Sequence, residues 1–332
     1  MRHARVVVHA CSVLVLIALA RPAAIPAQAA ESPVTVSTTT GTLQGTLTLP
    51  DGATTQWVPV ALIVAGSGPT NRDGSNPLGV TVTPYRLLAN ALALRGIATL
   101  RYDKRGIAAS TTSAPIPSGV TFQAYVDDVA AWARQLRADR RFSRIVVVGH
   151  SEGSLLAMLA AARAPVDGVV SLEGAGRPAV DIIVEQLKGA GAPETLLERT
   201  RQIGEAIRDG NDPGAVPDQL APLYPAYLRR YEREWFSIDP AQAAKAVPAP
   251  LLVIQGGADI QVNAADAHRL ADAHPGAMLR IIPKMTHVLL DAGGTDRASN
   301  IATYTDTSLP LDAALVDTIV AFILQTPLPP AS

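Results

Sequence analysis

The sequence predicts an α/β fold in which a mostly parallel sheet is flanked by helices and carries an inserted helical cap. Strand-like and helix-like segments alternate over most of the 332 residues, a pattern typical of parallel sheets. The run 145–148 is apolar on both faces, which indicates a central strand. Residues 176–247 break the alternation, because they are richer in charge, interrupted by prolines and lack a strand-like run. We therefore expect a core of residues 30–175 and 248–332, with 176–247 as the cap.

The other elements of the core follow from residue type and period. Residues 35–49, rich in Thr and Val and punctuated by glycine, predict an antiparallel hairpin. Further strands are expected at 58–65, 97–101, 145–148, 166–172, 251–254 and 278–282. Apolar residues at helical spacing predict helices at 85–95, at 125–136, from the turn after 148 to 163, between the last two strands, and at 311–324.

Composition excludes several classes of protein. The chain is 48% hydrophobic and 17% charged, so it is neither disordered nor a polytopic membrane protein. Its formal net charge is −1, and a nucleic-acid partner is disfavoured because phosphate backbones require clustered Lys and Arg.

Residues 1–29 predict an export signal. Arg2 and Arg5 precede the apolar run 13–20, and Ala27-Gln28-Ala29 has the small-x-small pattern that signal peptidase accepts. The run is shorter than the ~20 residues of a bilayer span, which disfavours the alternative of an uncleaved anchor. We expect cleavage after Ala29 and a periplasmic or secreted protein without stable membrane insertion.

A strand-to-helix turn carries the first sign of chemistry. Gly149-His150-Ser151-Glu152-Gly153 matches the G-x-S-x-G elbow, which holds a serine hydroxyl at the tip of a strained turn. An aliphatic strand precedes the motif and a helical pattern follows it, as the elbow requires. The alternative is a serine in an ordinary turn. We expect Ser151 to be a nucleophile.

A serine nucleophile needs a base, and His287 is the best candidate among six histidines. It follows the strand 278–282, at the carboxyl end of the sheet, where ligands bind in such folds. The other five lie in the signal, in the elbow or on a solvated helix: His3, His9, His150, His268 and His274. A structural loop histidine is the alternative.

The histidine in turn needs a carboxylate to fix its tautomer. Asp259 directly follows the strand 251–254, so we expect it at the same sheet edge as His287. The order Ser151, Asp259, His287 is that of hydrolases with this elbow. Glu173, at the end of the preceding strand, is the rival acid, and a turn aspartate is the structural alternative for Asp259.

The oxyanion of a tetrahedral intermediate needs two donors, normally backbone N–H groups. Glu152 supplies one because it follows the nucleophile, and Ser67, in the Gly66-Ser67-Gly68-Pro69 turn, is placed to supply the second. A phosphate-binding loop is the alternative for this turn, but no G-K-[ST] sequence accompanies it.

These residues together resemble the α/β-hydrolase superfamily, in the branch of esterases similar to serine aminopeptidases and dienelactone hydrolases. The resemblance covers nearly all of residues 34–326. The stretch 101–106 resembles the D-x-R-G motif of that branch, and 65–74 resembles its oxyanion loop. The resemblance implies that Asp103 and Arg105 organise loops beside the active site. Ala108 departs from the family pattern, which has a second glycine there.

The function expected from these residues is an exported serine hydrolase that cleaves a small-molecule carboxylic ester through an acyl-enzyme. No metal or organic cofactor is implied, and Cys11, the single cysteine, lies in the signal. A serine peptidase or amidase is the alternative with the same machinery. A catalytically silent binding protein on the same fold is the alternative of a different class.

Aromatic residues gather in the expected cap. Tyr227, Tyr231 and Trp235 repeat every four residues, which predicts that they share one helical face. This face either packs the cap onto the core or lines a pocket over Ser151. We expect Tyr231 and Trp235 to contact the substrate.

Overall fold

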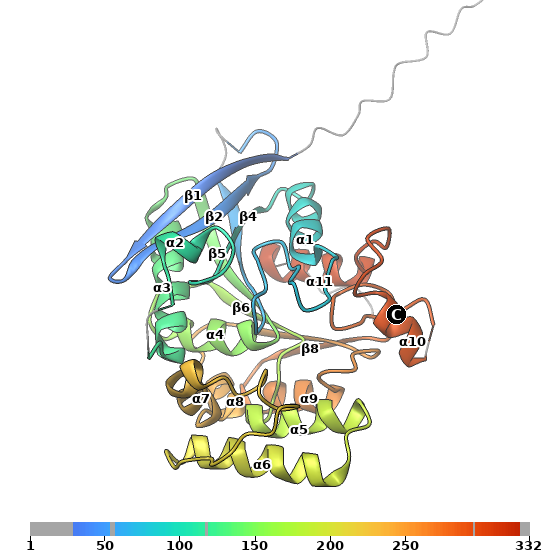
Figure 1. The fold of residues 1–332 in the computed structure, drawn as a ribbon. Helices are drawn as coiled ribbons and strands as arrows, with labels where there is room; N and C mark the ends of the chain where they lie inside the picture. The colour runs from blue at the N-terminus through green and yellow to red at the C-terminus, as the bar shows by residue number, and fades with distance from the viewer. Residues whose placement is uncertain (1–28, 54–56, 117–118, 295, 326–332) are drawn as a thin grey trace, which may run out of the picture.

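The computed structural model describes residues 29–53, 57–116, 119–294 and 296–325, so the expected signal lies outside the described residues. One eight-stranded sheet runs through the molecule in the order β1-β2-β4-β3-β5-β6-β7-β8 (Figure 1). β1 and β2 form an antiparallel hairpin, β2 pairs antiparallel with β4, and all other neighbours are parallel. The strands are β1 (Ala30–Thr38), β2 (Gly41–Leu49), β3 (Val58–Val64), β4 (Ala98–Tyr102), β5 (Phe142–His150), β6 (Gly168–Leu172), β7 (Leu251–Gly256) and β8 (Met278–Ile282).

Helices cover both faces of the sheet and form two apolar layers. Buried residues of α3, α4, α8 and α9 pack on one face, and those of α1 and α11 pack on the other. The helices outside the cap are α1 (Pro84–Ala93), α2 (Ser110–Ser113), α3 (Phe122–Ala138), α4 (Glu152–Ala161), α9 (Ala264–Ala273), α10 (Arg297–Ala302) and α11 (Ala313–Leu324). Because β5 lies between β3 and β6 and is apolar on both sides, its carboxyl end reaches the middle of the sheet edge.

Residues 176–247 contain helices and no strand. They hold α5 (Ala179–Gly189), α6 (Glu194–Arg208), the 3-10 helix η1 (Ala226–Leu228), α7 (Arg229–Phe236) and α8 (Pro240–Lys245). Ile203, Ile207, Leu220, Tyr224 and Phe236 are among the buried residues of a small separate core between α5, α6 and α7. α5 and α6 lie side by side beyond the carboxyl edge of the sheet (Figure 1).

The predicted strands and long helices are present, with differences at their ends. The hairpin begins at Ala30 rather than at residue 35, and β4 lies one residue later than expected. The first helix ends at Ala93 rather than near residue 95, because Gly96 turns the chain with φ 79°. Tyr227 precedes α7 in η1, so the prediction of one helical face through Tyr227 was wrong. No helix among the described residues is long and apolar enough to cross a membrane.

Candidate active site

Ser151 lies at the turn between β5 and α4, with φ 54° and ψ −121°, a backbone conformation that L residues avoid. Two glycines make the turn possible. A Cβ on Gly149 would lie 2.1 Å from the Gly153 carbonyl oxygen, and a Cβ on Gly153 would lie 2.3 Å from that of Val64. The Ser151 N–H donates to the Leu172 carbonyl (2.8 Å), which fastens the turn to β6. The strained turn is therefore held by its neighbours, as at other functional sites.

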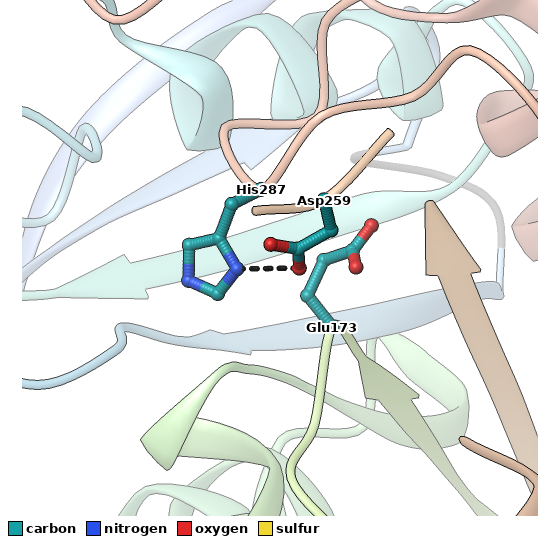
Figure 2. A group of neighbouring side chains, drawn as sticks. All are labelled: Glu173, Asp259 and His287. Atoms are coloured by element: carbon teal, nitrogen blue, oxygen red, sulfur yellow. Dashed lines mark hydrogen bonds and ion pairs between the residues drawn. The ribbon is translucent and has the colours of Figure 1, made fainter. Parts of the chain in front are cut away.

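His287 and Asp259 meet across two neighbouring loops, after β8 and β7. Nδ1 of His287 lies 2.7 Å from Oδ2 of Asp259 (Figure 2). The second oxygen of Asp259 accepts the N–H groups of Gln261 (2.6 Å) and Val262 (3.1 Å). Burial alone would raise the pKa of Asp259, but His287 and the hydrogen bonds outweigh it and hold the pKa at about 2. The ionised carboxylate can fix the imidazole tautomer and stabilise an imidazolium.

Glu173, the rival acid, lies against Asp259 rather than against His287. Its Oε1 accepts the N–H of Gly256 (2.8 Å), and its Oε2 accepts a hydrogen bond from the Gln255 amide. Among the described residues, no hydrogen bond joins Glu173 to His287. The carboxylate placed to orient the histidine is thus that of Asp259.

His150, the residue before the serine, ties three loops of the site together. The Gly66 N–H donates to the Tyr85 hydroxyl (3.2 Å), and that hydroxyl lies 2.7 Å from Nδ1 of His150. Nε2 of His150 lies 2.8 Å from the carbonyl oxygen of His287, so Nε2 carries the hydrogen and Nδ1 accepts from Tyr85. Burial, and then the nearby His287, lower the pKa of His150 to about 3, which keeps this ring neutral. The 66–69 turn, the elbow and the His287 loop are therefore held in one network.

Lys104 joins the two segments that carry the expected oxyanion donors. Its Nζ donates to the Gly66 carbonyl (2.5 Å), next to Ser67, and lies 3.5 Å from Oε1 of Glu152. The lysine side chain is 3% exposed. The Glu152 N–H belongs to the first turn of α4, where the helix itself supplies no acceptor. Ser67 and Glu152 both line the cavity described below.

The 101–106 segment forms ion pairs with the 65–74 loop, through Asp103 and Arg72, and with α3, through Arg105 and Asp128. Asp103 accepts from the backbone N–H (2.7 Å) and guanidinium (2.6 and 3.0 Å) of Arg72, and from the N–H of Ala109 (3.1 Å). Arg105 binds Asp128 of α3 through two hydrogen bonds of 2.6 and 2.9 Å. The contacts of Asp103 agree with the loop-organising role that the family resemblance implied, whereas Arg105 contacts α3 and the turn between β1 and β2.

A cavity of about 540 Å³ opens over Ser151, between the sheet edge and the cap. This volume lies within the usual range of small-molecule sites. Most of its walls are apolar, and its polar lining includes Lys104, Glu152, Arg177 and Glu232.

Comparisons with known proteins find similar sequences and similar folds. Residues 78–202 match the family model described as serine aminopeptidase, S33. Esterase EstD of Thermotoga maritima is 29% identical over 262 residues, which cover 76% of this chain and 59% of the length of that relative.

Two solved structures resemble the chain over most of its length. Est1E from Butyrivibrio proteoclasticus has a TM-score of 0.55 at 17% identity, covering 88% of this chain and 98% of that chain. The α/β hydrolase GrgF from Penicillium sp. sh18 has a TM-score of 0.53 at 17% identity, covering 78% of this chain and 91% of that chain. The chain is an α/β-hydrolase by fold.

On this fold, the two aromatic residues expected at the substrate fit both interpretations given for them. Tyr231 and Trp235 line the cavity. Both also pack on Phe122 of α3, with ring centroids 5.4 and 6.2 Å away, and the Trp235 ring is stacked on Phe122. Tyr227 lines the same cavity and is 66% exposed.

Sequence reasoning missed two residues of the site, Lys104 and Tyr85, and the contact of Glu173 with Asp259. Lys104 lies in the quoted 101–106 motif, which was a usable signal. Tyr85 carried none, because its contact with His150 depends on how α1 packs on the sheet.

The side chains of Glu173, Asp259 and His287 are of types that bind metals and lie within 4.8 Å of one another. A cation there would have to displace the hydrogen bond between His287 and Asp259.

Proposed function

We propose that this α/β-hydrolase is a serine hydrolase that cleaves carboxylic esters through an acyl-enzyme intermediate, with Ser151, His287 and Asp259 as its triad. The observation that carries the proposal is the hydrogen bond between Asp259 and His287 beside a strained elbow that turns Ser151 toward the cavity. The network through His150 supports it, because it places the His287 loop directly against the elbow.

Acylation begins when Oγ of Ser151 attacks the ester carbonyl carbon and its proton passes to Nε2 of His287. The N–H groups of Ser67 and Glu152 donate to the resulting oxyanion, and Asp259 stabilises the imidazolium. The intermediate collapses, the C–O bond to the alcohol breaks, and His287 returns the proton to the departing alkoxide. The acyl group remains on Ser151.

Deacylation repeats these steps with water. His287 takes a proton from the water, the hydroxide attacks the acyl carbon, and the acid leaves as Ser151 regains its proton from His287. Only the neutral form of the imidazole can act as the base in these steps. The steps use the three side chains of the triad, the two backbone N–H groups and water.

The shape of the cavity supports an apolar substrate group of moderate size. Its apolar walls suit an acyl or alcohol chain, and the relative EstD is named as an esterase. The family model of a serine aminopeptidase supports amide hydrolysis as the second candidate.

Hydrolysis rates on a series of p-nitrophenyl esters, beside p-nitroanilides of amino acids and short peptides, test the choice. We expect kcat/KM for the preferred ester to exceed that of every anilide by at least about 10²-fold. Comparable rates on an anilide would assign the chain to the peptidases, and no turnover of either class would favour a binding protein.

We also propose export, on the strength of residues 1–29 alone. Expression with the full N-terminus and sequencing of the mature protein tests this. The expected mature protein begins at Ala30 and is recovered from the periplasm or the medium. Recovery of uncleaved protein from the cytoplasm would contradict it.

A further inference from the structure

Glu173 is a buried acid that the catalytic steps do not use. It follows β6 directly, its side chain has no exposed surface, and its backbone has φ 53°, in the left-handed region. Because Leu172 pairs with Ile254, the register brings Glu173 to the end of β7 and to the Asp259 loop. Figure 2 shows its carboxyl group beyond Asp259, on the side away from His287. Such strain persists only where the surrounding structure holds it, which makes Glu173 a candidate for function.

The two carboxyl groups share one partner of opposite charge. The Asp259 side chain is fully buried, and the ion pairs of the described residues bring neither acid a Lys or Arg. Among the described residues, His287 is the single basic group that forms an ion pair with either acid, and its partner is Asp259. The other titratable groups that act on this pair are His150, whose low pKa keeps it neutral, and the hydroxyl of Tyr304. Carboxylate oxygens of Glu173 and Asp259 lie within 4.8 Å of each other. Two negative charges at this distance in a buried site disfavour each other, so one of the two acids keeps its proton.

The hydrogen bonds decide which acid keeps the proton. Asp259 accepts from His287 and from two backbone N–H groups, which favour its ionised form. Glu173 accepts one backbone N–H, from Gly256, and the Gln255 amide is shared among several oxygens. Burial, the charge of Asp259 and a hydrogen bond to that carboxylate raise the pKa of Glu173 well above its ordinary value.

We propose that Glu173 is a positioning residue that stays protonated and donates its O–H to the carboxylate of Asp259. The donated hydrogen bond holds the Asp259 carboxyl group from the side away from His287 and disperses part of its charge. The pair of acids then carries a single negative charge, on Asp259 next to His287. The inference rests on the proposed function for its kinetic consequences, but the protonation of Glu173 does not depend on it.

Glu173→Gln tests the charge, because glutamine is neutral and still donates toward Asp259. The amide of Gln255 must rotate to present Oε1, which has no hydrogen-bond partner among the described residues, so a loss of up to about tenfold in kcat is compatible with the proposal. We expect the midpoint of the acidic limb of the kcat/KM–pH profile to stay within about 0.3 pH units of wild type. A fall of about one unit or more would mean that a negative charge had been removed, and would overturn the proposal.

Glu173→Leu tests the hydrogen bond. Without the donated bond, Asp259 carries its full charge and is less firmly held, so the midpoint should rise and kcat should fall about 10- to 100-fold. Asp259→Asn is the reference for loss of the orienting acid, with an expected fall of about 10⁴ in kcat. A leucine variant identical to wild type in both readouts would exclude a positioning role. A glutamine variant as impaired as Asp259→Asn would make Glu173 the acid.

Infrared difference spectroscopy gives a readout that needs no activity. Wild-type protein at pH 7 should show a carbonyl stretch of a buried protonated carboxylic acid that is lost in Glu173→Gln and kept in Glu232→Gln, because Glu232 is also partly protonated at this pH. Absence of the band from the wild type would overturn the proposal even if the enzyme is active. If the wild type hydrolyses no ester but keeps the band, the proposed function fails while the protonation of Glu173 stands.

Discussion

At the scale of single residues, Ala108 stands where the resembling family has glycine and adopts the conformation that favours glycine. It is exposed and has φ 41°, whereas its neighbour Ala109, also exposed, has φ −68°. The left-handed conformation costs an alanine roughly 1–2 kcal/mol, which the Asp103 bond to the Ala109 N–H helps to offset.

Ala108→Gly should therefore be at least as stable as wild type, and up to about 1 kcal/mol more stable. Ala109→Gly is the matched control and should lose about 0.5–1 kcal/mol, because its backbone needs no glycine. Urea unfolding of the two variants measures the difference. Equal losses in both would mean that the turn carries no strain at Ala108.

Glu232 is a buried acid in the wall of the cavity. Burial raises its pKa to about 7 despite Arg229, which lies 3.2 Å from one oxygen. The other oxygen has no hydrogen-bond partner within the part of the chain that the structure describes. The folded protein thus holds a proton between pH 4.5 and 7 that the unfolded chain has lost. The contribution of Glu232 to stability is therefore present below pH 4.5 and is lost as the pH rises through 7.

Glu232→Gln should not lose this stability as the pH rises, because glutamine does not ionise. Its free energy of unfolding, relative to wild type, should increase by about 1–2 kcal/mol between pH 4.5 and 8, with partial exposure to the cavity already discounted. Urea unfolding at both pH values measures it, with the exposed Glu198→Gln as control. A difference that is constant with pH would show that Glu232 ionises normally.

At the scale of elements, Lys104 fixes the distance between the 66–69 turn and the start of α4. Lys104→Met should lower kcat about 10- to 100-fold, because the two oxyanion donors are no longer held in place, with KM changed less than threefold. It should also lose about 3–5 kcal/mol of stability by leaving Glu152 unpaired.

The double variant Lys104→Met, Glu152→Gln separates these two effects. It removes the unpaired charge, so most of the stability should return while kcat stays low. If kcat recovered together with stability, Lys104 would matter for folding alone.

The segment formed by η1 and α7 both packs the cap and lines the cavity, and its aromatic residues Trp235 and Tyr227 differ in how far they serve each task. Trp235→Ala should change the ratio of kcat/KM between short and medium esters about five- to tenfold and also destabilise the protein. The loss should stay below the roughly 3–5 kcal/mol of a fully buried Trp, because Trp235 is half-buried. Tyr227→Ala, at an exposed position of the cavity lining, should change the ratio without the loss of stability. An unchanged ratio in both variants would place the acyl pocket elsewhere.

At the scale of the whole molecule, sequence patterns predicted the features that depend on residues close together in the chain. The elbow, Asp259 and His287 could be located because each directly follows an apolar strand, and parallel strands end at one sheet edge. The contact of Glu173 with Asp259 depends on the register of β6 and β7, and that of Lys104 with Gly66 depends on β4 and β3 being neighbours. Neither is encoded in a local pattern. Short α10 lacked the length for a detectable period.

The central claim is that Ser151, held in a strained turn beside the hydrogen-bond network of His150, is the nucleophile that cleaves the ester. Labelling with a fluorophosphonate probe tests it most directly, because the probe reacts with an activated serine whatever the natural substrate is. The wild type should carry one label, on the peptide that contains Ser151, and Ser151→Ala should lose both the label and about 10⁴- to 10⁶-fold in kcat. Labelling or ester hydrolysis that persists in Ser151→Ala would contradict the account.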